Sequence, residues 1–314
     1  MSQVEIPGGH RPPLQPLSMN KNLSIGFIGF GEAGFNIAGG LKSAGLSRIF
    51  AYDINAHSPE LGPKIQQRAK DSETTLVDSS RELALSSDIL FSTVTADQDV
   101  RAAEQTAPFL EPRHIYADLN SVSPAVKQSI EKIVVGRGAQ FVEAAVMAPV
   151  SPHGHRAPML LGGKAAAAFS ELMTPYGMRL EVISEQVGAA AATKMFRSIV
   201  VKGLEALLFE CVLGASRYGA EERVFASLTE TFPGVDWKRL ADYMIGRVVV
   251  HGERRAREME EVADTLRALG IEPIMAAATA RRQDWCAQLG IGSRFGPNGP
   301  GSYKDALKAV DGQT

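Results

Sequence analysis

The stretch Leu23–Asp53, LSIGFIGFGEAGFNIAGGLKSAGLSRIFAYD, decides the fold of this chain. Its opening apolar run, residues 25–30, is as short as a buried strand and is bounded by glycine. A helical pattern follows over residues 35–41 and breaks at a glycine, and a second apolar run, residues 48–52, leads to Asp53. Strand, glycine turn, helix and strand in this order predict a βαβ unit of the dinucleotide-binding type.

The glycine turn has the spacing G-x-G-x-x-G, formed by Gly29, Gly31 and Gly34. The first glycine permits a tight turn, the second lets a diphosphate approach the backbone, and the third lets the helix pack close to the strand. Glu32 and Ala33 begin the helix, whose unpaired N–H groups and positive dipole end suit phosphate. The glycine spacing alone is weak evidence, because such turns also occur in βαβ units without a ligand, but the complete order of elements favours a cofactor site.

Asp53 bears on which cofactor is bound. It lies about 20 residues beyond the glycines, where a carboxylate accepts hydrogen bonds from a ribose 2′-hydroxyl. Residues 53–56 contain no arginine that could neutralise a 2′-phosphate. The sequence therefore favours NAD over NADP, although Arg48 or Lys64 could approach from outside the motif and keep NADP possible.

The composition describes an ordinary globular protein. The chain has 314 residues, 45% of them hydrophobic, and a net charge of −2, so nothing points to nucleic acid or an anionic membrane. Only Cys211 and Cys286 are present, which predicts no disulfide framework and fits a reducing cytoplasm. No apolar run reaches the about 18 residues that a membrane span needs, and the start of the chain lacks the order of a signal peptide. Residues 1–22 are rich in proline and polar residues, which predicts a flexible tail.

Strand and helix patterns alternate through the first half of the chain. Thr93, Val94 and Thr95 end one buried strand and are expected at the carboxyl edge of a parallel sheet, where ligands bind. The alternation predicts a doubly wound, mainly parallel α/β Rossmann sheet. The expected strands are 88–94, 114–119 and 141–146, the expected helices are 60–70, 96–110 and 125–135, and 149–158 is expected to be a loop.

From residue 188 onward helical patterns dominate. They predict an all-α second domain that begins with a long interdomain helix. The expected domains are a tail at 1–22, an NAD(P)-binding domain at 23–187 and a helical substrate and dimerisation domain at 188–314. The expected helices are 189–218, 221–231, 237–250, 253–269 and 273–289, followed by a loop at 293–302.

Three motifs in this order carry a family resemblance: FIGFGEAG at 27–34, DLNSVSP at 118–124 and GAAAATKM at 188–195. The chain resembles the β-hydroxyacid dehydrogenases, the group of 3-hydroxyisobutyrate dehydrogenase and, more distantly, 6-phosphogluconate dehydrogenase. The resemblance covers about residues 24–219, and the segment 249–273 looks like the C-terminal domain of an uncharacterised branch. It implies NAD or NADP as cofactor, a small hydroxy acid or sugar acid as substrate, and a homodimer.

Lys194 is the catalytic residue that the resemblance implies, held on the interdomain helix as a general acid and base. A lysine in a partly dry cleft can exchange a proton with a substrate hydroxyl or carbonyl. The alternative is a solvated helix lysine, but apolar residues surround Lys194 in the sequence. Glu205 lies roughly 20° round the helix from Lys194 and is interpreted as a structural ion-pair partner.

The chain departs from the family after this lysine. Arg197 and Ser198 stand where the family has asparagines, and an arginine would offer a fixed fork to a carboxylate or phosphate. We expect Arg197 and Ser198 to bind substrate, with an outward-pointing Arg197 as the alternative. The acid that 6-phosphogluconate enzymes carry seven residues after the lysine is replaced by Val201, which counts against a decarboxylating activity.

Asn120 and Ser121 are the expected contacts of a substrate carboxylate, and Asn120 also of the nicotinamide. Hydroxyl and N–H groups at the start of a helix suit such a ligand. The alternative is helix capping, which is the expected role of Ser123 with Pro124 at the first helical position.

Two further segments are open to interpretation. Met147-Ala148-Pro149 replaces a Ser-Gly-Gly turn of the family, so substrate recognition must differ here. His153 and His155 lack acidic or cysteine partners nearby, and no metal site is expected. The basic cluster at 251–257 is expected to be a salt-bridged helix face, unless Arg254, or Arg255, closes over the substrate.

The sequence thus predicts an NAD(P)-dependent oxidoreductase acting on a small β-hydroxy acid or sugar acid. A first rival is a dinucleotide-binding protein that has lost catalysis and serves sensing. A second is an imine or opine-type reductase on the same scaffold, which Lys194 disfavours because imine reductases resembling this family usually lack the lysine.

Overall fold

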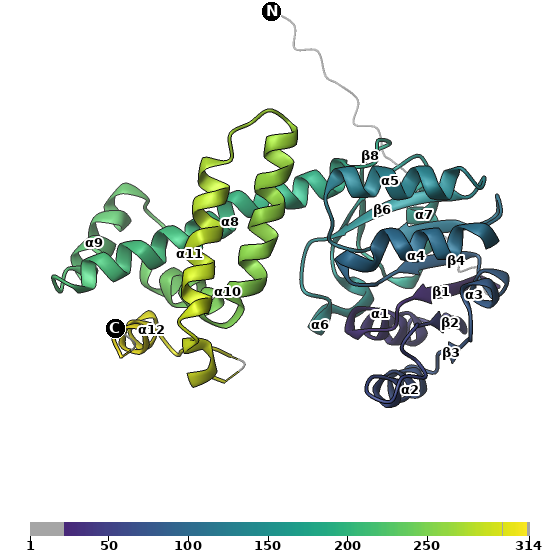
Figure 1. The fold of residues 1–314 in the computed structure, drawn as a ribbon, viewed down its shortest axis with the longest axis horizontal. Coiled ribbons are helices and arrows are strands. Elements are labelled where there is room, and N and C mark those ends of the chain that lie inside the picture. The colour runs from purple at the N-terminus through teal and green to yellow at the C-terminus, as the bar shows by residue number, and fades with distance from the viewer. Residues whose placement is uncertain (1–21, 297, 313–314) are drawn as a thin grey trace, which may run out of the picture. The chain divides into compact units, whose positions relative to one another are not determined.

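The computed structural model describes residues 22–296 and 298–312, and the chain forms two compact units, Met1–Ala190 and Ala191–Thr314 (Figure 1). The predicted domain boundary, at residue 188, lies three residues before the boundary between these units. Apart from Asn22, the predicted tail lies outside the described residues.

The first unit is built on one sheet whose strand order is β3-β2-β1-β4-β5-β6-β7-β8. Neighbouring strands run parallel except β6 and β7, which are antiparallel, so the prediction of a doubly wound, mainly parallel sheet is confirmed. The order reverses between β1 and β4, and ligands bind at the carboxyl ends of the strands at such a switch point. The strands are β1 Ser24–Ile28, β2 Arg48–Tyr52, β3 Thr75–Leu76, β4 Ile89–Ser92, β5 Ile115–Asp118, β6 Gln140–Val146, β7 Met159–Gly162 and β8 Leu180–Ser184.

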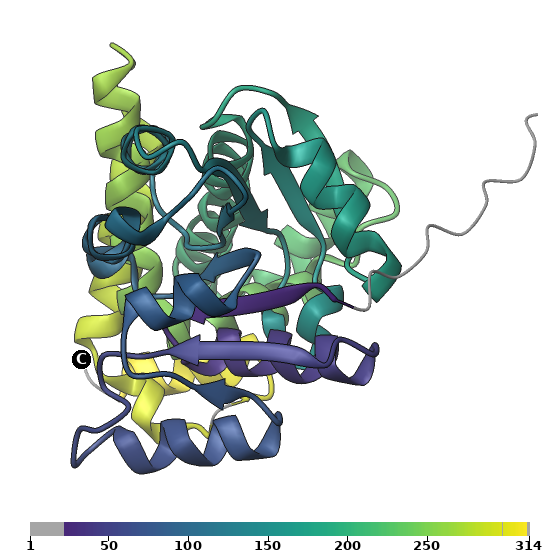
Figure 2. The same ribbon diagram turned by 90° about the vertical axis from the view of Figure 1, so that its right-hand side faces the viewer.

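Helices cover both faces of this sheet (Figure 2). Side chains of α1 (Glu32–Ser43), α2 (Gly62–Asp71) and α7 (Ala166–Met173) pack into one core. Side chains of α3 (Ser80–Ser86), α4 (Asp99–Thr106) and α5 (Pro124–Val135) pack into the other. The first core is anchored by edge-to-face aromatic contacts, with Phe91 lying 5.3 Å from Phe27 and 5.7 Å from Phe169 between ring centroids.

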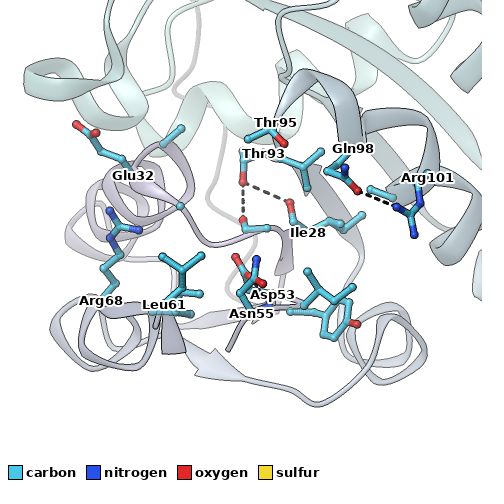
Figure 3. Close-up of a pocket in the computed structure, with 18 of the residues that line it drawn as sticks. Ile28, Glu32, Asp53, Asn55, Leu61, Arg68, Thr93, Thr95, Gln98 and Arg101 are labelled. Atoms are coloured by element: carbon cyan, nitrogen blue, oxygen red, sulfur yellow. Dashed lines mark hydrogen bonds between the residues drawn. The ribbon is translucent and has the colours of Figure 1, made fainter. Parts of the chain in front are cut away.

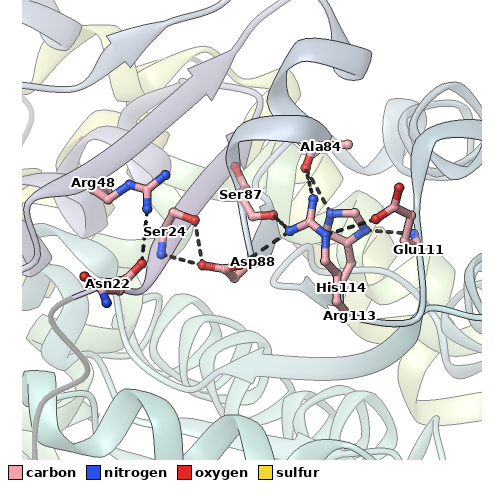
Figure 4. A network of polar contacts seen from close by, with 9 residues as sticks. All are labelled: Asn22, Ser24, Arg48, Ala84, Ser87, Asp88, Glu111, Arg113 and His114. Atoms are coloured by element: carbon pink, nitrogen blue, oxygen red, sulfur yellow. Dashed lines mark hydrogen bonds and ion pairs between the residues drawn. The ribbon is translucent and has the colours of Figure 1, made fainter.

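A polar network fixes the amino ends of three strands (Figure 4). Asp88 Oδ2 accepts hydrogen bonds from the backbone N–H of Ser24 at 2.9 Å and from its hydroxyl at 2.7 Å. Arg113 donates to the Ser87 carbonyl at 3.1 Å, and the His114 ring contacts the Ala84 carbonyl at 2.9 Å. The register of β1, β4 and β5 is therefore held at the edge opposite to their carboxyl ends.

The second unit consists of helices. The 28-residue α8 (Ala189–Ser216) spans the boundary, and α9 (Glu221–Thr231), α10 (Trp237–Ala268), α11 (Ile274–Gln288) and α12 (Tyr303–Asp311) follow. In Figure 1, α10 and α11 lie side by side, and one core joins Phe209, Ile245 and Tyr303. The predicted helical second domain is confirmed. No helix among the described residues is both long and apolar enough to cross a membrane.

Several expected boundaries were wrong. The two helices expected at 237–250 and 253–269 are one helix, α10, with a break at His251, whose φ of −124° and ψ of 15° are not helical. The expected helix 96–110 is α4 flanked by two 3₁₀ turns, and β7, α7, β8 and α12 were not predicted because their apolar runs are short. Short helical turns also occur in the expected loops, at α6 (Val150–His153), η3 (Gly154–Arg156) and η5 (Ile291–Arg294), and the remaining 3₁₀ turns are η1 (Ala96–Gln98), η2 (Ala107–Phe109) and η4 (Thr174–Tyr176).

Candidate functional site

A cavity of about 460 Å³ opens at the carboxyl ends of β1, β2 and β4 (Figure 3). Its walls come from the glycine turn, the end of β2, one face of α2 and the segment after β4. Among the residues of these elements that were predicted to hold the dinucleotide, Gly34 does not line the cavity. The others do: Gly29, Gly31, Glu32, Ala33, Asp53, Thr93, Val94 and Thr95. The cavity therefore lies where the strand order reverses, as the sheet topology requires of a ligand site.

Two of the three motif glycines are needed by the fold itself. Gly29 has φ of +81°, and a Cβ there would lie 3.0 Å from the Thr93 carbonyl oxygen. A Cβ on Gly34 would lie 2.9 Å from Thr93 Oγ1, the hydroxyl that donates to the Gly29 carbonyl at 2.7 Å. These glycines let the turn pack directly against the end of β4.

Gly31 is different, because its surroundings are open. Among the described residues, no heavy atom outside Gly31 and its two chain neighbours lies within 4 Å of the position that a Cβ would take. Its φ of −71° is one that any residue adopts, so the fold does not require glycine here. No side chain of the described residues caps α1, whereas Ser79 caps α3 and Ser123 caps α5. The uncapped N–H groups and the open space at Gly31 fit the diphosphate of a dinucleotide.

Asp53 fastens the end of β2 to the glycine turn. Its Oδ2 accepts a hydrogen bond from the Phe30 N–H at 2.7 Å, and its Oδ1 accepts one from the Asn55 N–H at 2.8 Å. A carboxylate oxygen has two lone pairs, so each oxygen can still accept a bond from a ribose hydroxyl. The geometry fits the predicted role of Asp53.

Two cations on α2 line the same cavity. Lys64 is exposed and Arg68 is half-buried, and neither forms an ion pair within the part of the chain that the structure describes. They lie one helical turn apart, so both face the cavity. Lys64 was named from the sequence as a cation that could approach a 2′-phosphate, but Arg68 was missed. The spacing of Leu61, Lys64 and Arg68 places them on one helix face and could have indicated Arg68.

Asn120 is held in place by hydrogen bonds to side chains of β4 and α4. It is buried, and its Nδ2 donates to Ser92 Oγ at 2.9 Å and to Asp99 Oδ1 at 2.7 Å. The group that Asn120 can still offer to a ligand is therefore its amide oxygen, a hydrogen-bond acceptor. An amide or hydroxyl donor suits this oxygen, whereas a substrate carboxylate would need a donor such as the exposed Ser121 hydroxyl.

Beneath Asn120 lie two buried carboxylates and one buried lysine. Lys127 Nζ lies 2.9 Å from Asp118 Oδ1, and the Oδ2 atoms of Asp99 and Asp118 are both buried. One lysine cannot neutralise two carboxylates. Burial, with the Asp118 charge beside it, raises the pKa of Asp99 to about 7. The sequence carried no signal for Asp99, because no motif contains it.

Asp99→Asn should change how stability depends on pH. With a pKa of about 7 against an ordinary 3.8, Asp99 keeps a proton in the fold that the unfolded chain releases, so stability falls as pH rises from about 4 to 7. The loss is on the order of 4 kcal/mol. We expect Asp99→Asn to match wild type below about pH 4 and to be increasingly more resistant to urea than wild type as pH rises to about 8.

Two signals distinguish the two units in this test. Both tryptophans, Trp237 and Trp285, lie in the second unit, so their fluorescence reports on that unit while far-UV circular dichroism reports on both. Asp97→Asn, at an exposed position two residues away, is the control. Equal pH slopes for wild type and Asp99→Asn would contradict a shifted Asp99.

The start of α8 is anchored in the first unit by Glu143, a buried residue of β6. Its carboxylate accepts hydrogen bonds from the N–H groups of Gly188 and Ala190. Gly188 has φ of +107°, a conformation that favours glycine. A carboxylate at the first turn of a helix is favourable, and this anchor fixes the turn that leads to Lys194. Sequence reasoning assigned Glu143 to a strand and missed this contact.

The predicted residues of α8 differ in exposure. Lys194 is half-buried and Arg197 is exposed. The Ser198 hydroxyl donates to the Lys194 carbonyl at 3.2 Å, one turn earlier in the same helix. Lys194 and Ser198 therefore lie on neighbouring turns of one helix face.

The basic cluster of α10 contains two kinds of arginine. Arg255 is buried and donates through Nε to Glu205 Oε2 at 2.7 Å, so Glu205 is the structural ion-pair partner of a residue fifty positions away. Arg254 is exposed and pairs with Glu258 at 2.8 Å, as in a solvated helix face.

The two histidines after β6 do not meet metal ligands. His155 is buried against α1, where a Cβ on Gly40 would lie 2.0 Å from its Nδ1. Within residues 22–296 and 298–312, no group of three or more histidine, cysteine or acidic residues could hold a metal ion.

Comparison with known proteins agrees with this geometry. Residues 24–180 match the family described as the NAD binding domain of 6-phosphogluconate dehydrogenase, and residues 215–286 match a domain of unknown function, DUF1932. The mitochondrial 3-hydroxyisobutyrate dehydrogenase of Drosophila melanogaster is 27% identical over 223 residues, which are 68% of this chain and 65% of that protein.

Two solved structures are similar over nearly their whole length. A conserved hypothetical protein from Sinorhizobium meliloti 1021 is 34% identical with a TM-score of 0.81, covering 96% of this chain and 99% of that one. MTH1747 is a conserved protein of unknown function that is described as structurally similar to 3-hydroxyacid dehydrogenases. It is 31% identical with a TM-score of 0.74, covering 86% of this chain and 99% of that one. With its open glycine turn, the aspartate at the end of β2 and these relatives, the chain belongs to the 3-hydroxyacid dehydrogenase-like family that binds NAD(P) through the domain type of 6-phosphogluconate dehydrogenase.

Proposed function

We propose that this protein is an NAD(P)-dependent oxidoreductase that acts on the hydroxyl of a small β-hydroxy acid or sugar acid. The observation that supports it best is the donor-lined opening at Gly31 beside Asp53, in a chain that belongs to a dehydrogenase-like family. Its small-molecule substrate, its action as a homodimer and the catalytic role of Lys194 are parts of the proposal.

Each proposed role follows from the chemistry of the side chain. Hydride exchange with the substrate carbon is the chemistry that the nicotinamide supplies when bound. Lys194 takes the proton from the substrate hydroxyl during oxidation and returns it during reduction. Ser121 donates to the substrate carboxylate, Arg197 and Ser198 add polar contacts from α8, and the Asn120 oxygen accepts a hydrogen bond from an amide or hydroxyl.

The cofactor preference depends on a balance of charges around the ribose. Asp53 repels a 2′-phosphate and accepts from a 2′-hydroxyl. Lys64 and Arg68, which line the same cavity, attract a phosphate and partly offset that repulsion. We therefore propose NAD as the preferred cofactor and NADP as a weaker ligand.

A panel of hydroxy acids and sugar acids, assayed with NAD and NADP separately, tests the function. We expect substrate-dependent formation of reduced cofactor, seen as an increase in absorbance at ~340 nm, with at least one acid of the panel. The dissociation constant of each cofactor can be measured by quenching of protein fluorescence or by calorimetry. We expect a lower constant for NAD than for NADP. Binding of NAD without turnover of any acid would contradict the enzyme proposal and leave only the binding role.

The rival that the sequence favours next is a dinucleotide-binding protein without catalysis. The departures at Met147-Ala148-Pro149 and at Arg197 support it, because they change the segments where the resemblance places substrate contacts. An imine or opine-type reductase would instead consume reduced cofactor, NADH or NADPH, when given imines or amino acids with keto acids. Lys194 argues against that activity.

A further inference from the structure

The second unit has a groove of its own on α10. It encloses about 350 Å³ and is lined by Arg239, Tyr243, Arg247, His251, Asn298 and Gly301. All these residues belong to Ala191–Thr314, so the groove does not depend on how the two units are arranged. The matched domain of unknown function, residues 215–286, supplies the α10 wall.

Arg247 is held in a fixed orientation at the groove. Its Nε lies 3.4 Å from Glu205 Oε1, its Nη1 donates to the Tyr243 hydroxyl at 2.8 Å, and its guanidinium lies 5.3 Å from the Tyr243 ring centroid. A guanidinium has five N–H donors; one is bonded to the Tyr243 hydroxyl, and the one on Nε lies on the side of Glu205. The remaining donors keep a planar fork, the arrangement that binds carboxylate or phosphate oxygens in pairs.

The charges behind Arg247 do not balance. Glu205, which is fully buried, accepts from Arg255 and also faces Arg247, so one carboxylate serves two guanidiniums. On the same network Lys202 and Arg254 share the single carboxylate of Glu258. Glu261 is a third acid near Lys202, so four cations, Lys202 and three arginines, stand against three carboxylates. The network therefore carries excess positive charge, and Arg247 is its member that lines the groove.

Among the described residues that line the groove, two arginines, Arg239 and Arg247, outnumber the one acid. Asp242, its only acidic lining residue within the described chain, accepts from the Tyr303 N–H at 2.7 Å and so serves the start of α12. Arg239 is exposed and has no ion-pair partner among the described residues. Burial and the charges of Arg254, Arg247 and Arg255 lower the pKa of His251, with Glu258 opposing. A neutral imidazole can donate or accept a hydrogen bond.

The walls of the groove are set by close backbone packing. A Cβ on Gly299 would lie 2.9 Å from Val250 Cγ2, and one on Gly252 would lie 2.9 Å from the Gln283 carbonyl oxygen. The break of α10 at His251 lies between these two contacts. Packing on both sides of the break holds the loop and the helix in place, so the groove is preorganised.

We propose that this groove is a binding site for a compact anion, the carboxylate or phosphate group of a small metabolite. Arg247 and Arg239 supply charged donors, and His251 and Asn298 supply neutral hydrogen bonds. A bound anion places a counter-charge beside the network in which cations outnumber carboxylates. The proposal stands independently of the dehydrogenase function.

Titration of the full chain with inorganic phosphate and, in separate arms, with malonate tests the site at constant ionic strength. Calorimetry should show binding of one or both anions, and Arg247→Gln or Arg239→Gln should weaken it at least about tenfold. Arg217→Gln, at an exposed arginine of the same unit that pairs with Asp311, is the matched control and should bind like wild type.

A second readout does not depend on the stability of the Arg247 variant. The His251 ring signal in NMR, assigned with His251→Gln, should titrate at higher pH when the anion is present, because a bound anion favours the imidazolium. Phosphate without malonate binding, or the reverse, identifies the class of anion. Binding of neither anion, or equal binding by wild type and both arginine variants with an unmoved His251 signal, would overturn the proposal.

Discussion

Lys194→Ala is expected to lower kcat by roughly 10³-fold, because removal of a positioned acid and base costs about 10²–10⁴-fold in rate. The dissociation constant of NAD(H) should stay within about twofold of wild type, because the proposed cofactor contacts at Gly31 and Asp53 lie outside α8. Steady-state rates with the best acid of the panel measure the first effect, and cofactor titration measures the second.

Two variants of the same helix make this result specific. Lys194→Arg keeps the positive charge but cannot release its proton at neutral pH, so it should be nearly as slow as Lys194→Ala. Arg197→Ala, at the exposed neighbour, should raise KM with little loss of kcat if Arg197 only binds the substrate. Turnover by Lys194→Ala within tenfold of wild type would remove Lys194 from the mechanism, while the cofactor site would remain.

Gly31→Ala is expected to weaken cofactor binding by at least about tenfold, or 1.4 kcal/mol, with little change in thermal stability. The added methyl group meets no atom of the fold, since nothing lies within 4 Å of it, but it occupies the opening that the diphosphate needs. The stability cost should stay near that of an alanine at a helix N-cap, below about 1 kcal/mol.

Gly34→Ala is the matched comparison in the same motif. Its methyl group would lie 2.9 Å from Thr93 Oγ1 and 3.0 Å from the Gly29 carbonyl oxygen, so the cost falls on the fold, at about 1–3 kcal/mol. Calorimetric melting and NAD titration of both variants separate the two effects. Unchanged NAD affinity in Gly31→Ala would mean that the diphosphate does not bind at this turn.

The features that the sequence predicted correctly are local. Residues 23–53 carry a strand, a turn, a helix and a strand whose signals lie within a few residues of each other, and the structure places each where it was expected. The change from alternating strands to helices near residue 188 is also readable, because it rests on periodicity over many residues. Short segments such as the antiparallel β7 and the terminal α12 were not predicted, because runs this brief contain too few periods to be recognised.

Most of the site outside the glycine turn depends on contacts between distant residues. Asp99 has a raised pKa because α4 buries its carboxyl, beside Asp118 of β5 and in contact with Asn120. Glu143 anchors the start of α8 from 45 residues away, and Glu205 meets Arg255 across 50 residues. None of these pairs has a spacing that a linear pattern could reveal.

The amino-acid sequence by itself determined the βαβ unit, the cofactor class that the glycines and Asp53 favour, and the order of the two domains. Backbone sterics and hydrophobic periodicity act over one or two turns of chain, so they can be read directly. Only the tertiary structure decided which glycine faces open space, which oxygen Asn120 offers and where uncompensated positive charge collects on α10. Desolvation and pairing of charges depend on which elements pack together, and that is a property of the folded chain.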